Sequence, residues 1–315
     1  MRHKIPCKKY RLPGLICLLF AFVLPATSVV SFAGDVENQD RALFWSIRKG
    51  GEPAGYILGT IHSEDPRVLD FSEDFLLRLK DNDIFAMELV PDLPTLARLT
   101  EYMHYPPGQT LESVIGVDRY NSLVSAMSPY KVPVEFISQM KPWAAMLTLS
   151  TPPPETGYFM DLSLSLRASG NGLKVVGLET LEQQLSFLQS MPLAMQLSLL
   201  DQAVADHGRV NEVHEEMVSV YLENDLLGLQ TLSDEQLQNV DEEAGEYFLN
   251  SGINDRNLHM AESLLPELEN SRVFVAVGAL HLPGEHGLLN ILRRNGFDLD
   301  AMDPPFREVP VTMGQ

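Results

Sequence analysis

Two apolar runs that lie far apart in the chain end in the same way. Residues 56–58 and 273–277 are rich in Ile, Leu, Val and Phe, and each run leads into a Gly-x-x-His segment that ends at His62 or His281. Apolar runs of this kind that stop at Gly are typical of buried strands. The pattern therefore predicts two buried strands, each presenting an imidazole just beyond its carboxyl end.

Two further apolar runs carry a carboxylate near their ends. Residues 84–90 contain Glu88, and residues 172–179 finish with Glu179. Thr180 and Gln183 then form a capping box, so a helix is expected to begin immediately after Glu179. Burying a carboxylate in an apolar strand is unfavourable unless it has a partner, which makes Glu88 conspicuous.

Most of the remaining chain shows helical periodicity. Ser72 precedes acidic residues and an apolar face, as at a helix start. Helix-spaced apolar residues also occur at 93–103, 119–127, 142–149 and 161–168.

A helical middle is predicted over about 185–270. Turn-forming residues within it predict interruptions near 191–192, 206–208 and 250–252. A helix over 285–295, stopped by Gly296, and an extended segment over 297–301 are predicted to follow.

Strands that alternate with helices predict an α/β (α+β) fold. We expect one domain over residues 34–315, with a mixed, largely parallel central sheet, a large helical insertion and two related halves. Such sheets bind ligands beyond the carboxyl ends of their strands. His62, Glu88, Glu179 and His281 are therefore expected to gather at one edge of the sheet.

The first 33 residues have the features of a secretory signal peptide. A basic start precedes the apolar stretch 15–24, and small residues near Ala33 offer a cleavage site. The stretch is short for a membrane span, so a retained anchor is the alternative and no stable anchor is expected after cleavage. The predicted location is periplasmic or secreted.

Composition narrows the chemistry. Both cysteines, Cys7 and Cys17, lie in the predicted signal peptide, so the mature protein would have neither a thiol nucleophile nor a thiolate metal site. The net charge is −20, and the predicted signal contains basic residues but no acidic ones, so the mature chain is more acidic still. Such a surface repels phosphate backbones, which argues against a nucleic-acid partner.

Two imidazoles and one or two carboxylates suit a divalent ion such as zinc, manganese or cobalt. A carboxylate that does not bind the ion could act as a general base on a bound water. Each residue also has a plainer explanation: a histidine after a strand can belong to a turn, and Glu179 can stabilise the N-terminus of its helix. The repetition of the pattern favours a site.

Other polar residues give weaker indications. His207 and His214 stand among glutamates, a pattern more typical of a solvated helix face than of a metal site. His286 is expected to lie on the helix after His281, at the periphery. Arg256 could pair with a carboxylate or with a substrate carbonyl.

Several of these segments together resemble the TraB/GumN family, which includes the animal Tiki metalloproteases. The resemblance runs from about Phe44 to Asp300. It is carried by Leu58–His62, Ala86–Glu88, Lys141–Trp143, Gly177–Thr180 with Gln184, Arg256–Asn257, and Val277–Gly284 with Gly287–Leu288. Pro283 departs from the pattern, since many relatives have a small aliphatic residue there.

The resemblance implies a mixed α/β fold, related to those of erythromycin esterases and haem-binding ChaN, with a split site built from both Gly-x-x-His motifs and a glutamate. Transferred to this chain, it makes His62 and His281 the motif histidines and Glu88 the glutamate, with Glu179 and Arg256 as supporting polar residues. Metal-dependent peptide hydrolysis belongs to the Tiki branch.

The leading hypothesis is an exported metal-dependent hydrolase, a metalloprotease that cleaves a peptide bond with metal-activated water. His62, His281 and Glu179 would hold or order the metal, Glu88 would be a ligand or the general base, and Arg256 would assist catalysis. The alternative is a non-catalytic periplasmic protein that binds a peptide, a signal molecule or haem. The expected partner is a peptide or small-molecule substrate.

Overall fold

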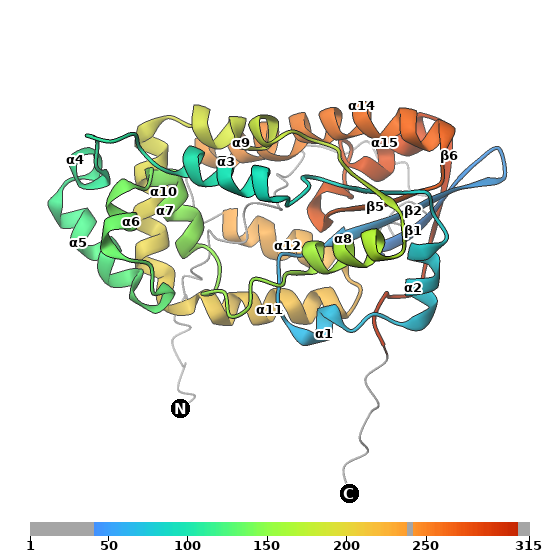
Figure 1. Cartoon of the computed structure of the whole chain (residues 1–315), viewed down its shortest axis with the longest axis horizontal. Coiled ribbons are helices and arrows are strands. Elements are labelled where there is room, and N and C mark those ends of the chain that lie inside the picture. Colours follow the sequence, from blue (N-terminus) through green and yellow to red (C-terminus); the bar gives the residue numbers. More distant parts are fainter. Residues whose placement is uncertain (1–40, 238–241, 308–315) are drawn as a thin grey trace, which may run out of the picture.

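The computed structural model describes residues 41–237 and 242–307, and its centre is a six-stranded sheet (Figure 1). The predicted signal peptide lies outside the described residues. The strands follow the order β4-β3-β5-β2-β1-β6. Their bounds are β1 Phe44–Lys49, β2 Glu52–Thr60, β3 Ile84–Met87, β4 Lys174–Gly177, β5 Val273–Gly278 and β6 Phe297–Ala301.

Strands β4, β3, β5 and β2 are parallel to one another, so their carboxyl ends lie at one edge of the sheet. Thr60 of β2 pairs with Gly278 of β5, and Met87 of β3 pairs with Gly177 of β4. Strands β1 and β6 are antiparallel to their neighbours. The sheet is therefore mixed and largely parallel, as predicted.

The hairpin of β1 and β2 turns at two glycines. Gly50 and Gly51 have φ angles of 57° and 88°, which lie in the left-handed region that favours glycine. The turn lets β1 pair back along β2 and places β2 beside β5. The two strands that precede the Gly-x-x-His histidines are therefore direct neighbours.

Helices surround the sheet and extend beyond one end of it. The α-helices are α1 Pro66–Leu69, α2 Glu73–Lys80, α3 Leu93–Met103, α4 Leu111–Ile115, α5 Val117–Ala126, α6 Val134–Gln139, α7 Pro142–Leu149, α8 Met160–Gly170, α9 Leu181–Ser190, α10 Leu193–Asp206, α11 Val210–Leu222, α12 Leu226–Leu237, α13 Glu242–Tyr247, α14 Asp255–Asn270 and α15 Leu288–Arg294. Shorter 3-10 turns are η1 Ser128–Tyr130, η2 His207–Arg209 and η4 Ala279–His281, and η3 Phe248–Asn254 is a π-helix.

One hydrophobic core lies on both faces of the sheet. In Figure 1, α14 and α15 cover one face, while α2 and α8 lie on the other. Phe274 of β5 is fully buried, and its ring contacts those of Phe44, Tyr56, Phe75 and Phe85. Every residue of β5 is buried, which explains its continuous apolar sequence.

A second hydrophobic core holds the helical region together. Buried residues from α4 to α7 pack with those of α9, α10 and η3, and Trp143 and Phe248 are among the largest. Figure 1 places α4, α5 and α6 at the end of the molecule farthest from the β1–β2 hairpin. This region overlaps the predicted helical middle over 185–270 only in part, because it also contains α4 to α7, whereas α11, α12 and α14 pack into the core of the sheet.

The predicted elements mostly match the structure. Helices α3 and α7 cover residues 93–103 and 142–149, and Thr180 and Gln183 form the predicted capping box. The predicted break at 250–252 is wrong, because the chain continues there as the π-helix η3. Phe248 and Ile253 are buried within η3, so packing outweighs the local turn preference of Asn-Ser-Gly.

No helix in the two described ranges is both long enough and apolar enough to cross a membrane.

Candidate functional site

The four residues predicted to share a site all lie at the carboxyl edge of the parallel strands. Glu88 follows β3, Glu179 follows β4, His62 follows β2, and His281 ends the 3-10 turn η4 after β5. The backbone N–H of Glu179 donates to the carbonyl of Glu88 at 2.9 Å, so the two strand ends stay in register beyond the sheet.

The glycine of the first Gly-x-x-His motif makes room for the second motif. A Cβ atom on Gly59 would lie 2.8 Å from the Cα of Ala279 and 2.9 Å from Cδ1 of Leu282. These contacts are too short for any side chain. Gly59 therefore lets the turn that carries His281 pack directly against β2.

Glu88 is buried and hydrogen-bonded through both oxygens. Oε1 accepts from the backbone N–H of Gly278 at 2.7 Å, and Oε2 accepts from Arg256 at 2.6 Å and from Gln184 at 3.1 Å. Burial alone would raise the pKa of Glu88, but the positive charge of Arg256 and these hydrogen bonds outweigh it and lower the pKa. Glu88 is therefore an anion at neutral pH.

Arg256 joins the two glutamates. Its guanidinium donates to both oxygens of Glu179, at 2.6 to 3.1 Å, as well as to Glu88, and its residue is only 2% exposed. Burial raises the pKa of Glu179, although Arg256 partly offsets this. Both Glu179 oxygens are thus directed at Arg256. This arrangement suits a role for Glu179 in holding the Arg256 side chain in place.

His281 is fully buried, and its neighbours define its tautomer. Nδ1 lies 2.7 Å from Oδ1 of Asn257, while Nδ2 of Asn257 donates to the carbonyl of His286 at 2.9 Å. Because that carbonyl can only accept, the amide orientation is set, Oδ1 faces the ring, and Nδ1 must carry the hydrogen. Burial lowers the pKa of His281 to about 3, so Nε2 presents a lone pair.

That lone pair has no hydrogen-bond partner among the described residues. Nε2 of His281 lies 3.8 Å from Oε1 of Glu88, so two electron-rich atoms face each other in a buried space. Most buried polar atoms are paired, so an exception of this kind needs an explanation. A cation between the two atoms would satisfy both.

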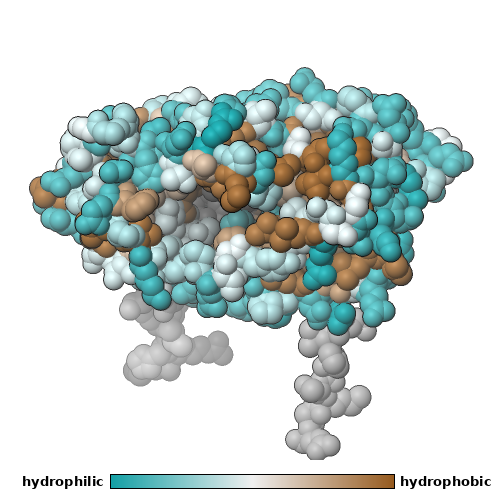
Figure 2. All heavy atoms as spheres, in the orientation of Figure 1, coloured by the Kyte–Doolittle hydropathy of each residue, from teal (hydrophilic) through white to brown (hydrophobic). Residues whose placement is uncertain are grey.

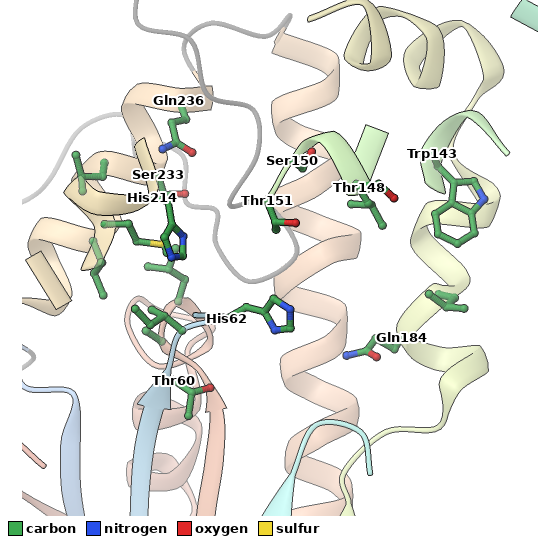
Figure 3. A pocket seen from close by; sticks show the side chains of 18 of the residues that line it. Thr60, His62, Trp143, Thr148, Ser150, Thr151, Gln184, His214, Ser233 and Gln236 are labelled. Atoms are coloured by element: carbon green, nitrogen blue, oxygen red, sulfur yellow. The ribbon is translucent and has the colours of Figure 1, made fainter. Parts of the chain in front are cut away.

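His62 reaches the same region from the neighbouring strand. Its ring stacks on that of Phe159 with a centroid distance of 3.8 Å. Burial, and secondarily the nearby His214, lower the pKa of His62 to about 4, so this imidazole is also neutral. Figure 3 shows His62 projecting into the pocket on the same side as Gln184, which contacts Glu88.

The residues after His62 are held on two sides. The hydroxyl of buried Ser63 lies 3.0 Å from Nε2 of His214. The carboxylate of Glu64 accepts from the backbone N–H groups of residues 155–157, at 2.7 to 3.2 Å. The loop that carries His62 is therefore tied to α11 and to the segment before α8.

A pocket of about 370 Å³ opens above these strand ends. His62, Thr60 and Leu280 contribute to its floor, and helices α3, α7, α9, α11 and α12 form its walls (Figure 3). The face shown in Figure 2 is hollowed near its centre, and hydrophobic residues border the hollow. Of the proposed site residues, His62 lines this ligand-sized space directly. Glu88, Glu179, Arg256 and His281 are buried beside it and are not among its lining residues, and Gln184, which lines the pocket, donates to Glu88.

Two polar residues near the pocket escaped the sequence interpretation. His214 was expected on a solvated helix face, and this was wrong: its ring lines the pocket, because the opposite side of α11 packs on the sheet core. Asp161 accepts from the hydroxyl of Thr60 at 2.7 Å, and burial raises its pKa to about 6. Either residue could have been predicted only by knowing which face of its helix turns toward the sheet. His207 and His286 are exposed. His286 was expected on the helix after His281, and this was wrong, because α15 begins only at Leu288 and His286 lies in the turn before it.

The donor chemistry at this base fits a divalent metal ion in part. His281 offers a neutral, oriented nitrogen, and Glu88 offers an anionic oxygen 3.8 Å away, so these two residues would hold such an ion. Within the described ranges, no group of three or more His, Cys, Asp or Glu residues forms a metal site. The pair therefore supplies two donor atoms, and a further ligand is needed to complete a shell.

Comparisons with known proteins agree with the sequence resemblance. The zebrafish (Danio rerio) protein "Metalloprotease TIKI2" is 22% identical over 332 residues, covering 85% of this chain and 62% of the relative. The Xenopus tropicalis "Metalloprotease TIKI2" is 23% identical, covering 82% and 59%, and the Nematostella vectensis "Metalloprotease TIKI homolog" is 20% identical, covering 85% and 68%.

This chain spans about three fifths of the length of the two TIKI2 relatives. No solved structure gives a significant match. The TraB/PrgY/gumN family matches residues 43–301, which include the whole sheet and every residue of the site described above. The chain therefore belongs to the TraB/PrgY/gumN family.

Proposed function

We propose that this protein is a metal-dependent hydrolase that cleaves a peptide bond. The observation that carries the proposal is the buried lone pair on Nε2 of His281, which faces the anionic Glu88 at 3.8 Å; Gln184, which donates to Glu88, also lines the pocket. Two electron-rich atoms are held in this way at an energetic cost unless a cation joins them. The metalloprotease names of the distant relatives support the same reaction class.

His281 and Glu88 would hold the ion, and we propose His62 as the further ligand that completes the shell. Zinc, manganese and cobalt all accept this combination of nitrogen and oxygen donors. When bound, such an ion supplies an acidified water molecule and polarises a scissile carbonyl. Asn257 would orient His281 by accepting its Nδ1 hydrogen, a common arrangement for metal-binding histidines.

The surroundings of Glu88 favour a role as ligand and counter-charge. An efficient general base has a pKa near the working pH. Arg256 and the Gly278 N–H lower the pKa of Glu88 instead, which weakens it as a base but keeps it anionic. Glu88 would therefore neutralise the metal charge and hold its neighbours in place.

Glu179 and Arg256 would act indirectly, by positioning Glu88. Both oxygens of Glu179 engage Arg256, so Glu179 orients the guanidinium that in turn fixes Oε2 of Glu88. The resulting chain of charge-assisted hydrogen bonds gives Glu88 one position. Arg256 is buried, and its support of the reaction would pass through Glu88.

Metal analysis of purified protein tests the proposal directly. We expect the wild-type protein to retain a divalent ion after dialysis and to hydrolyse peptides when Mn²⁺, Co²⁺ or Zn²⁺ is supplied. His62→Ala and His281→Ala should each lose metal and activity while keeping the far-ultraviolet circular dichroism spectrum. Unchanged metal content and hydrolysis in both variants would exclude the proposed centre.

A second candidate function is ligand capture without turnover. The described residues contain no ready group of three metal ligands, and the pocket is largely apolar. These features also suit a binding protein for a peptide, a signal molecule or haem. Saturable binding together with no cleavage under any of the three metals would favour this function.

We further propose that the protein is exported. The basic start and the short apolar stretch within residues 1–33 support this. N-terminal sequencing of protein from a periplasmic extract should place the mature start near residue 34. An intact N-terminus on protein found in the cytoplasm would contradict export.

A further inference from the structure

The walls of the pocket above His62 are mainly apolar. They combine aliphatic and thioether side chains from four helices that come together only in the folded chain. They include Leu99 and Met103 of α3, Leu147 of α7, Met217 of α11, and Leu229 and Leu232 of α12. Methionine side chains adapt to differently shaped apolar groups, so two of them in one wall suit a range of bulky side chains.

The pocket contrasts with the charge of the whole chain. The sequence contains 43 Asp and Glu residues and has a net charge of −20, yet none of the described lining residues is Asp, Glu, Lys or Arg. The polar lining groups are neutral hydroxyls, amides and imidazoles. A charged side chain that entered would lose hydration without gaining a counter-charge, which is strongly unfavourable.

The apolar pocket adjoins the proposed metal centre. Gln184 lines the pocket and donates to Oε2 of Glu88 at 3.1 Å, while Leu280 lines it next to His281 in the chain. Figure 3 shows His62 and Gln184 projecting into the same space. A group held by the apolar walls would therefore lie beside the bond to be cleaved.

The size of the pocket limits what it can hold. A volume of about 370 Å³ is at the small end of the range for small-molecule sites. It suits a short extended segment with one or two large side chains.

We propose that this pocket selects a peptide with a large uncharged aliphatic or aromatic side chain next to the scissile bond. The part of this proposal that places the side chain beside a scissile bond rests on the proposed hydrolase function. Its binding component depends only on the pocket. An experiment with separate cleavage and binding measurements can therefore distinguish the failure of either part.

The probes are acetylated peptide amides, Ala-Ala-X-Ala-Ala, with X as Leu, Phe, Ala, Lys or Glu. In the Mn²⁺-loaded protein, we expect cleavage beside Leu or Phe to be at least about tenfold faster than beside Lys or Glu, the scale that apolar pockets provide. Trp143 lines the pocket and is one of two tryptophans, so its fluorescence reports binding without turnover. The Leu and Phe peptides should also bind at least about tenfold more tightly than the Lys and Glu peptides.

Leu232→Lys tests the pocket itself. Leu232 is partly exposed and lies outside both hydrophobic cores, so the fold should tolerate the change. The new charge should weaken Leu and Phe peptide binding at least about tenfold and improve Glu peptide binding. Leu166→Lys, at a residue 53% exposed on α8 and outside the pocket, is the matched control and should leave the order of preference unchanged.

Each outcome decides one part. Selective binding of Leu and Phe peptides without any cleavage would support the pocket's selectivity but overturn the hydrolase and the position beside a scissile bond. Cleavage that is indifferent to X, or faster beside Lys or Glu, would overturn the selectivity while leaving the hydrolase intact. An absence of both binding and cleavage for all five peptides would overturn the pocket proposal, as would an unchanged preference in Leu232→Lys.

Discussion

Nε2 of His281 lies 3.8 Å from Oε1 of Glu88, and the two residues follow the neighbouring strands β5 and β3. Asn257 fixes the opposite nitrogen of the imidazole, and the Gly278 N–H fixes the carboxylate oxygen. Two electron-rich atoms are therefore oriented toward one another before any ion binds.

Asn257→Leu should weaken metal binding about 10- to 100-fold, the usual effect of losing a group that orients a metal ligand. Its Oδ1 is the acceptor that keeps the hydrogen of His281 on Nδ1. Competition with a chelator measures the affinity, and ¹⁵N spectra of the histidines measure the tautomer. Asn257→Asp keeps an oxygen acceptor and should recover part of the affinity.

Asn270→Leu provides a control on the same helix, because Asn270 is exposed and its side-chain amide donates to the carbonyl of Pro266 within α14. It should leave both measurements unchanged. Unaltered affinity and an unaltered His281 tautomer in Asn257→Leu would show that Asn257 does not orient the ring.

Gly59→Ala should destabilise the protein by roughly 2 kcal/mol or more, because the added methyl group would overlap the turn that carries His281. Urea denaturation measures the loss, and metal affinity should fall as the turn moves. Gly208→Ala is the matched control, since a Cβ atom there meets nothing within 4 Å. Equal stability of the two variants would refute the close packing of the two motifs.

Sequence reasoning located the strands and the four strand-end residues because their signals are local. The β5 run is buried throughout, and the Thr180–Gln183 capping box marks its helix without help from distant contacts. Parallel pairing brings the carboxyl ends of neighbouring strands to one edge of the sheet, and β2 and β5, which precede His62 and His281, are paired in this way. That the two imidazoles share one site stays a prediction.

The walls of the pocket could not be predicted in this way. His214 lies about 150 residues from His62 in sequence, and which face of α11 meets the pocket depends on packing against the sheet. The same limit applies to Asp161 and to the π-helix η3. For these residues, tertiary contacts outweigh the local pattern.

Arg256→Met should destabilise the fold by about 3–5 kcal/mol, because Glu88 and Glu179 would be left buried without their shared counter-charge. Adding Glu88→Gln and Glu179→Gln to that variant should restore part of the stability. Urea denaturation compares them with Arg119→Met, which breaks an exposed pair with Asp201 and should cost less than about 1 kcal/mol. A similar small loss in Arg256→Met would contradict the importance of the buried network.

The stability of Asp161→Asn relative to wild type should increase as the pH rises from about 4 to about 6. Burial raises the pKa of Asp161 from 3.8 to about 6, so between these values the folded protein binds a proton that the unfolded chain has released. Wild-type stability therefore falls as the pH increases through this window. Asparagine has no such ionisation and can still accept the hydrogen bond from Thr60.

The advantage of Asp161→Asn over wild type should grow by on the order of 2 kcal/mol between pH 4.5 and pH 7.5, because a tenfold change in proton affinity corresponds to about 1.4 kcal/mol and some solvent contact reduces the full effect. Urea denaturation of the metal-free proteins at both pH values measures it. Asp303→Asn, at an exposed position, should show no comparable growth. A constant difference between Asp161→Asn and wild type would mean that Asp161 ionises normally in the folded protein.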